Sequence, residues 1–278
     1  MTKWLPGGYN NWYSVSVDGA KFQLKFNHGA SERYSNFDYA ANRAALLLKQ
    51  QWSNKPLYLA LSGGIDSECV ANVLLRNQIE FTPVILKIES LNAIETWYAE
   101  YWCRKNNIVP VILEYTINDL CNSMIKFFPK LYAFKNYEQT PIMIVFDYVE
   151  QQGGHCIYSA GDINLEPGTD QFFCKSLDFI SDIVGKGRHP SAFFMYTPEL
   201  ALSYINKFDT SLDEQYNKLN FYGVSPRPKV DYLSSISSHD KFNEVRTKLL
   251  QMFKTDIYEF DARHWYGTRE QIIQQLQP

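Results

Sequence analysis

The sequence predicts an α/β fold built on a doubly wound, mostly parallel sheet, with a β-hairpin before it and a helical part after it. Short apolar segments alternate with longer amphipathic ones, which is typical of a parallel sheet that helices cover on both faces. Hydrophobic residues make up 45% of the 278 residues and charged residues 21%, which excludes a chain that is disordered as a whole. The expected strands are 57–61, 83–88, 109–113 and 156–160, and the expected helices are 66–77, 93–106, 117–133 and 141–151.

Two elements are expected before this alternation begins. Residues 13–26 predict a hairpin, because apolar and polar residues alternate on both sides of an Asp18-Gly19 pair, which favours a tight type I′ turn. Residues 37–52 predict a helix whose apolar face is formed by Tyr39, Ala40, Ala44, Leu47 and Leu48. We therefore divide the chain into a hairpin extension at 1–36, a core at 37–200, and a helical C-terminal part at 201–278 that packs on the core.

Charge and hydropathy argue against two classes of partner. With 27 basic and 30 acidic residues the formal net charge is −3, so a broadly basic nucleic-acid surface is not expected. No apolar run approaches the roughly 18 residues of a membrane span, and the first residues lack the apolar segment of a signal peptide. We expect a cytoplasmic protein whose partner is neither a membrane nor nucleic acid.

The cysteines and histidines do not form a recognisable metal or disulfide pattern. The five cysteines stand at positions 69, 103, 121, 156 and 174, and none of the five histidines lies at zinc-ligand spacing from a cysteine. Structural zinc sites need closely spaced Cys and His ligands. The sequence therefore predicts no zinc and no disulfide framework.

The most informative segment is LYLALSGGIDSECVANVLL, residues 57–75, in which an apolar strand passes through a Ser/Gly turn directly into a helix. Glycine lets the backbone approach a ligand closely, and the first amides of a helix have no partner within the helix. The helix dipole is positive at that end, so the turn predicts a cradle for an anion. Ser62 and Ser67 add hydroxyl donors, and Asp66 suits a phosphate that carries Mg²⁺. The competing interpretation is a plain Gly-Gly turn with Asp66 as a capping residue.

The segment is neither a Walker A loop, since no lysine follows the glycines, nor a Rossmann G-x-G-x-x-G turn. Its SGGxDS pattern, at residues 62–67, instead resembles the signature of the PP-loop superfamily of N-type ATP pyrophosphatases. The order of the central elements is similar to the synthetase domains of asparagine synthetase and β-lactam synthetase. The resemblance implies an adenine nucleotide α-hydrolase-like fold, cleavage of ATP between its α and β phosphates, and adenylation of a substrate oxygen.

The resemblance also implies roles for individual residues. The residues that would hold pyrophosphate are Ser62, Gly63, Gly64, Asp66 and Ser67. Asp66 would also bind Mg²⁺, and the backbone of Leu61 and Ile88 would contact adenine. Ser159, Gly161 and Asp162 match a second acidic loop, in which Asp162 is either a further Mg²⁺ ligand or a loop aspartate in an Asx turn.

Three later features have two interpretations each. Lys229 resembles a lysine that in the family stabilises negative charge near the reacting acyl centre, and Lys248 is the second candidate for this role. The alternative is that Lys229 is a solvated lysine at the start of a helix. Residues 163–190 are either a lid over the adenylate or a surface excursion. Glu199 either serves a substrate or simply follows Thr197 and Pro198 at a helix start.

Departures from the family pattern narrow the expected function. Thr2 follows Met1 where the glutamine-using relatives have a nucleophilic cysteine, so release of ammonia from glutamine by this chain is not expected. The cysteines of the zinc-binding, tRNA-thiolating and sulfonucleotide-reducing branches are also missing. We predict an ATP- and Mg²⁺-dependent ligase that activates a small-molecule carboxylate or amide oxygen for attack by ammonia or an amine. A separate amidotransferase subunit as the nitrogen source stays open. The alternatives are an enzyme that modifies a nucleobase or nucleotide and a non-catalytic nucleotide-binding regulator.

Overall fold

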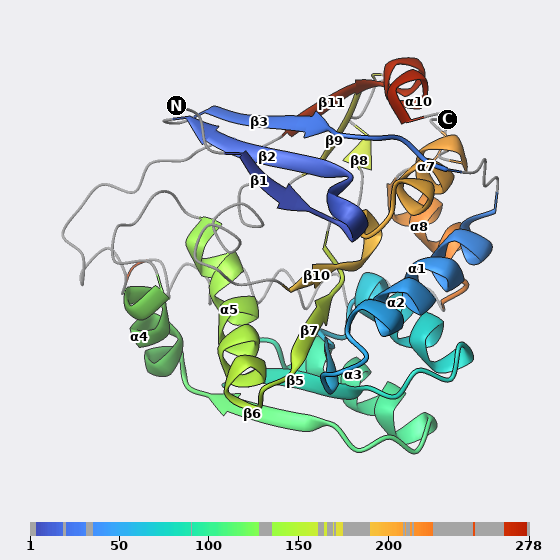
Figure 1. Ribbon diagram of the computed structural model, residues 1–278. Helices are drawn as coiled ribbons and strands as arrows, with labels where there is room; N and C mark the ends of the chain where they lie inside the picture. The colour runs from blue at the N-terminus through green and yellow to red at the C-terminus, as the bar shows by residue number, and fades with distance from the viewer. Residues whose placement is uncertain are drawn as a thin grey trace.

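A five-stranded parallel sheet forms the centre of the protein, in the strand order β10-β7-β4-β5-β6 (Figure 1). The computed structural model describes residues 4–18, 21–31, 36–89, 91–127, 135–160, 164–165, 169, 171–174, 190–207, 209, 212, 214–224, 247 and 264–276. The strands of this sheet are β4 (Leu57–Ala60), β5 (Thr82–Ile88), β6 (Val111–Tyr115), β7 (His155–Tyr158) and β10 (Ser191–Ala192). The four strands expected from the sequence are all present.

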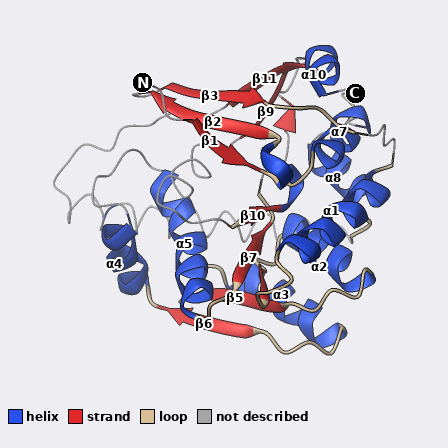
Figure 2. Ribbon diagram, in the orientation of Figure 1, coloured by secondary structure: helices blue, strands red, loops and turns tan. Residues whose placement is uncertain are grey.

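Helices connect the strands and cover both faces of the sheet (Figure 2). They are α1 (Phe37–Gln51), α2 (Ile65–Arg76), α3 (Ala93–Lys105), α4 (Ile117–Phe127), α5 (Lys135–Gln151), α7 (Pro198–Lys207), α8 (Glu214–Tyr222) and α10 (Arg269–Leu276). The predicted α/β class is confirmed. No helix in the described ranges is long and apolar enough to cross a membrane.

The path of the chain reverses at β4. From β4 it runs through α2, β5 and α3 to the edge strand β6, and then returns through α4 and α5 to β7, on the other side of β4. Helices on the outward and return paths therefore cover opposite faces, as the right-handed rule for such crossovers requires. Figure 1 shows α2 and α5 on opposite sides of the strands. The sheet is doubly wound, as predicted.

The buried faces follow from the sequence pattern. Leu57 and Leu59 of β4 are buried, and so are Val70, Val73 and Leu74 on one side of α2. This packing fixes the end of β4 and the start of α2, which are the two elements that hold the Ser/Gly turn.

The N-terminal hairpin belongs to a three-stranded antiparallel sheet that is tied to the body of the protein. Its strands are β1 (Trp4–Gly7), β2 (Tyr13–Asp18) and β3 (Lys21–Phe26), and the short helix η1 (Tyr9–Asn11) joins the first two. The hairpin was predicted and β1 was not. Asp18 pairs with Lys21, so the prediction of Asp18-Gly19 as the turn pair is wrong by one residue. Trp12 Nε1 donates to the Met195 carbonyl, which lies in η2 (Phe193–Met195), at 3.0 Å.

The end of the chain contributes a strand as well as a helix. Strand β11 (His264–Thr268) pairs antiparallel with β9 (Gln171–Cys174), which pairs with β8 (Asn164–Leu165). The sequence indicated short helical and extended pieces in a C-terminal part that is helical as a whole, and it did not place this strand, because one short strand carries no clear signal without its distant partner.

Two details of the predicted helices are corrected, and the end of a third helix lies outside the described residues. Tyr39 was placed on the apolar face of the first helix, but it is 54% exposed while Ala40 and Ala44 are buried. The helix predicted from 141 begins at Lys135, so Pro141 lies inside α5. The helix predicted over 117–133 is described only to Phe127, and 128–134 lie outside the described residues.

Candidate functional site

The Ser/Gly turn leaves the sheet at its centre. The backbone N–H of Leu61 donates to the Val84 carbonyl at 2.9 Å, which continues the pairing of β4 with β5 beyond Ala60. Helix α2 begins four residues later, at Ile65, with Gly64 as its N-cap and no side-chain capping hydrogen bond. The predicted strand, turn and helix are therefore in the expected order and register.

Gly63 holds the turn against a neighbouring helix. Its φ is +91°, in the left-handed region that favours glycine, and a Cβ at this position would overlap the Glu95 carbonyl of α3. The backbone of the turn and the first turn of α3 are thus in close contact. A larger residue at 63 would displace one of them.

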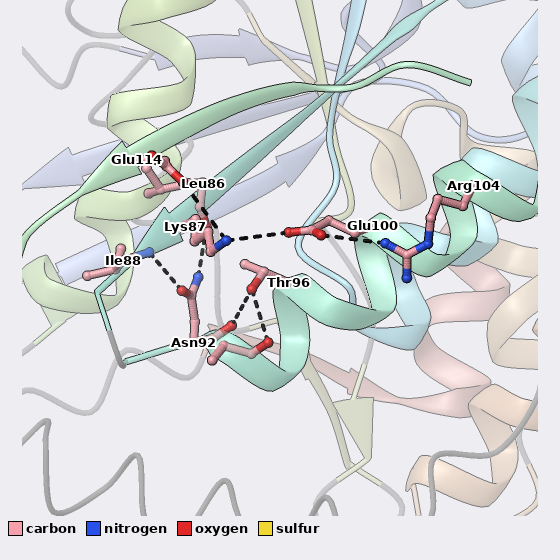
Figure 3. Close-up of polar contacts among 9 residues, drawn as sticks. Leu86, Lys87, Ile88, Asn92, Thr96, Glu100, Arg104 and Glu114 are labelled. Carbon is pink, nitrogen blue, oxygen red and sulfur yellow. Dashed lines mark hydrogen bonds and ion pairs between the residues drawn. The ribbon is translucent and has the colours of Figure 1, made fainter. Parts of the chain in front are cut away.

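Asn92 fixes the start of α3 (Figure 3). This is the end of the helix that contacts Gly63. Its Oδ1 accepts from the Ile88 N–H at 2.8 Å, and its Nδ2 donates to the Leu86 carbonyl at 2.8 Å. Thr96 Oγ1 donates to the Asn92 carbonyl at 3.0 Å, inside the first turn. One side chain therefore locks the end of β5 to the helix that follows it.

The two serines of the turn are linked to each other and to the backbone. Ser62 Oγ and Ser67 Oγ lie 3.0 Å apart, Ser67 Oγ donates to the Gly64 carbonyl at 3.0 Å, and the Gly64 N–H donates to Ser62 Oγ at 3.3 Å. Ser67 is fully buried while Ser62 is exposed. Ser67 thus shapes the turn from inside, and Ser62 lies at its exposed surface.

Asp66 meets two donors from helix α8, far along the chain. Tyr222 Oη donates to Asp66 Oδ1 at 2.8 Å, and Lys218 Nζ lies 3.2 Å from the same oxygen. Lys218 is only 6% exposed and Tyr222 5%. Sequence reasoning missed both residues. Their spacing of four places them on one face of a helix, but nothing in the sequence links that face to the turn.

Aromatic packing holds α8 in place. Tyr222 stacks on Phe194, with ring centroids 5.3 Å apart, and also lies 5.7 Å from the Phe37 ring at the start of α1. Phe221 lies 4.9 Å from the Tyr204 ring of α7. The helix that carries Lys218 is thus anchored by apolar contacts to three other parts of the fold.

The turn lies where the strand order of the sheet reverses. Ligands of open α/β sheets bind beyond the carboxyl ends of the strands at this reversal. The register pairs Leu59 with Ile157, and its continuation brings Leu61 level with Ser159. The structure therefore brings Ser62 and Ser159, which follow β4 and β7, to the same edge of the sheet.

The other predicted site residues fall into two groups. The backbone N–H groups of Leu61 and Ile88 donate to Val84 and Asn92, so a contact with adenine would have to use other atoms, and this role stays a prediction. The residues that lie outside the described part of the chain are Gly161, Asp162, Lys229 and Lys248. The segment 163–190 is described only at 164–165, 169, 171–174 and 190, so the lid also stays a prediction.

Glu199 has a structural explanation. Thr197 Oγ1 accepts from the Leu200 N–H at 3.2 Å, which is the predicted cap of α7. Glu199 is 8% exposed, and its carboxylate accepts from the Ser31 N–H and hydroxyl at 2.8 and 2.9 Å. It joins the segment before α1 to the start of α7.

The donor set at the turn suits a metal ion that arrives with phosphate. The described residues contain no group of three or more His, Cys, Asp or Glu that would hold a metal by themselves. Mg²⁺ commonly binds through one or two carboxylates together with substrate phosphates and water. One carboxylate, Asp66, beside the Ser62 and Ser67 hydroxyls fits that second arrangement.

The cysteine in α2 is not a nucleophile. Burial raises the pKa of the Cys69 thiol well above its usual range, and the charge of Asp66 raises it further. The thiol therefore stays protonated at neutral pH, whereas a nucleophilic cysteine needs a lowered pKa.

Three solved structures show a low similarity to this chain over much of its length. An NH3-dependent NAD synthetase from Campylobacter jejuni shares 16% identity over 81% of this chain and 98% of its own, with a TM-score of 0.38. An NMN synthetase from Francisella tularensis shares 15% identity over 76% of this chain and 96% of its own, with a TM-score of 0.37. A glutamine-dependent NAD+ synthetase from Acinetobacter baumannii shares 14% identity over 90% of this chain and 52% of its own, with a TM-score of 0.39.

No family model and no curated protein matches the sequence. At this level of identity the site has to be judged from the chain's own geometry. In that geometry the SGGxDS turn follows the central strand of a doubly wound parallel sheet and opens a helix. The turn on which the sequence resemblance rests therefore has the strand, turn and helix order that the sequence predicts.

Proposed function

We propose that the protein is an ATP-dependent ligase that adenylates a substrate oxygen and releases pyrophosphate. The observation that carries the proposal is the SGGxDS turn at the switch point of the sheet, with Gly63 held in a left-handed conformation and Asp66 at the first turn of α2. Backbone amides, hydroxyls and a carboxylate at that place suit a pyrophosphate group that carries Mg²⁺.

The proposed reaction balances as a displacement at the α-phosphorus of ATP. A carboxylate oxygen of the substrate forms a bond to that phosphorus, and the bond from it to the bridging oxygen of the β-phosphate breaks. The electron pair stays on pyrophosphate, so negative charge grows where the turn lies. Ammonia or an amine then attacks the acyl carbon and displaces AMP, and the attacking nitrogen loses one proton to solvent.

The chain contributes mainly position and charge to this step. The turn would hold the β and γ phosphates, which leaves the α-phosphorus facing the substrate. Preorganised donors at the point where charge develops are worth more than the same donors in water, because they need no rearrangement. Mg²⁺ bound by Asp66 with the phosphates would neutralise part of the charge of the leaving group.

The proposal is tested by exchange of labelled pyrophosphate into ATP, which requires no nitrogen donor. A panel of small carboxylic acids and carboxylate-bearing nucleotides is incubated with enzyme, MgATP and labelled pyrophosphate. With a substrate that is adenylated reversibly, the reverse reaction should incorporate the labelled pyrophosphate into ATP. Adding an amine should then give AMP in an amount equal to that of the amide product.

Asp66→Asn should abolish the exchange, because it removes the carboxylate proposed to bind the metal. Asp147→Asn is the matched control: it also converts an aspartate that pairs with a lysine, Lys126 at 2.8 Å, but on helix α5. Its exchange rate should match that of the native protein. Formation of ADP in step with product, in place of AMP, would contradict the proposal.

A further inference from the structure

Lys218 places a buried ammonium group at the proposed pyrophosphate turn. Its side chain is 8% exposed, and its Nζ lies 3.2 Å from Asp66 Oδ1. Burying a charged ammonium is costly unless the charge is paired. Asp66 provides that pairing.

Stability alone is a weak reason for this ion pair. A buried pair roughly breaks even against apolar residues of similar size, because both charges lose water. The aromatic contacts of Tyr222 and Phe221 already dock α8 on the start of α1, on Phe194 and on α7. The position of Lys218 at the turn therefore calls for another explanation.

The charge at the start of α2 gives that explanation. The first turn of this helix holds two acidic residues, Asp66 and Glu68, which oppose the attraction of its dipole for an anion. A polyanion such as pyrophosphate would need a compensating cation there. The turn also lacks the lysine that follows the glycines in a Walker A loop. Lys218 is a cation that the fold brings to the same place from a distant helix.

We propose that Lys218 is a further catalytic residue of the turn, one that donates to an oxygen of the pyrophosphate group. This inference rests on the proposed function. When ATP binds, the ammonium group shares its hydrogen bonds between Asp66 and a phosphate oxygen. When the bond between the α-phosphorus and the bridging oxygen breaks, the same group stabilises the charge left on pyrophosphate. A compact, rotatable ammonium suits this change of partner better than a planar guanidinium would.

The test measures binding of inorganic pyrophosphate, in the presence of Mg²⁺, by isothermal titration calorimetry. It requires no knowledge of the substrate. Lys218→Gln keeps a donor for Asp66 but loses the charge, and Lys218→Met loses both. Each should weaken binding by about 10- to 100-fold, the usual range for one hydrogen bond to a charged group. Lys126→Met removes a lysine of another ion pair and should leave binding unchanged.

Tyr222→Phe separates a direct contact with phosphate from an effect through Asp66. It removes a second donor to Asp66 Oδ1, at 2.8 Å, and keeps the ring in its aromatic cluster. Pyrophosphate affinity should stay within about threefold of native. A loss equal to that of Lys218→Gln would show that Lys218 acts only by orienting Asp66, and would overturn the inference.

Melting curves identify any variant that fails to fold. Of the two Lys218 variants, Lys218→Gln is expected to be the more stable, because its amide keeps a partner for Asp66. Native affinity in Lys218→Gln would refute the role of Lys218 and leave the proposed function intact. Failure of the native protein to bind pyrophosphate with Mg²⁺ would instead refute the proposed site itself.

Discussion

Replacing Gly63 with alanine tests how tightly the turn is held against α3. An alanine at φ +91° costs about 1–2 kcal/mol for its left-handed backbone. Its Cβ would also overlap the Glu95 carbonyl, and forcing extra volume into a packed site typically costs about 1–3 kcal/mol. The expected loss in the free energy of unfolding is therefore about 2–5 kcal/mol.

Gly153→Ala provides the matched control. Gly153 also has a left-handed backbone, with φ +68°, but nothing lies within 4 Å of the position a Cβ would take. This variant should lose only the backbone contribution of about 1–2 kcal/mol. The difference between the two variants isolates the contact with α3.

The stability of both variants is measured by urea denaturation followed by circular dichroism. Their midpoints can be compared when the free energy of unfolding depends on urea concentration with the same slope in both. Gly63→Ala should unfold at a clearly lower urea concentration than Gly153→Ala and should bind pyrophosphate more weakly. Equal midpoints and native affinity for pyrophosphate would refute the reasoning, because they would mean that α3 does not constrain the turn.

Two other predictions concern Asn92 and the buried cysteines. Asn92→Ala removes the two 2.8 Å hydrogen bonds that lock β5 to α3, and should lower the free energy of unfolding by about 1–3 kcal/mol and weaken pyrophosphate binding. Asn106→Ala, at the other end of α3, should bind pyrophosphate as the native protein does. An equal loss of pyrophosphate affinity in the two variants would contradict the prediction. Burial raises the pKa of Cys69 and Cys156, and that of Cys103 to about 11, so alkylation of these thiols should stay slow up to pH 9 and become fast in urea. Because these thiols lose their protons at lower pH in the unfolded chain than in the folded protein, the free energy of unfolding should fall as the pH rises above about 8.5. Rapid alkylation of any of these three cysteines in the native protein would contradict the prediction.

The parts of the fold that sequence predicted correctly are those whose signal is local. The β4 strand, the Ser/Gly turn and the α2 helix form one continuous segment, and each has its own pattern of apolar residues, glycines or helical spacing. Thr197 as the cap of α7 is equally local, because a cap and its amide lie three residues apart.

The parts that were missed depend on contacts between distant segments. Strand β11 is stabilised by pairing with β9, which lies about ninety residues earlier by the numbering of both strands. The contacts of Lys218 and Tyr222 with Asp66 arise from the packing of α8 on α2, which no spacing within α8 reveals. The lysine selected from sequence, Lys229, lies outside the described residues, so its role stays a prediction beside the proposed one of Lys218.

The central claim is that residues 62–67 hold the β and γ phosphates of ATP. A crystal structure of the native protein with Mg²⁺ and α,β-methylene-ATP, whose bond between the α and β phosphates cannot be cleaved, tests this claim most directly. We expect the terminal phosphates to accept hydrogen bonds from the turn and from Lys218, with the α-phosphate facing the edge of the sheet near Ser159. Phosphates bound elsewhere, or a turn that contacts only the sugar or the base, would contradict the account.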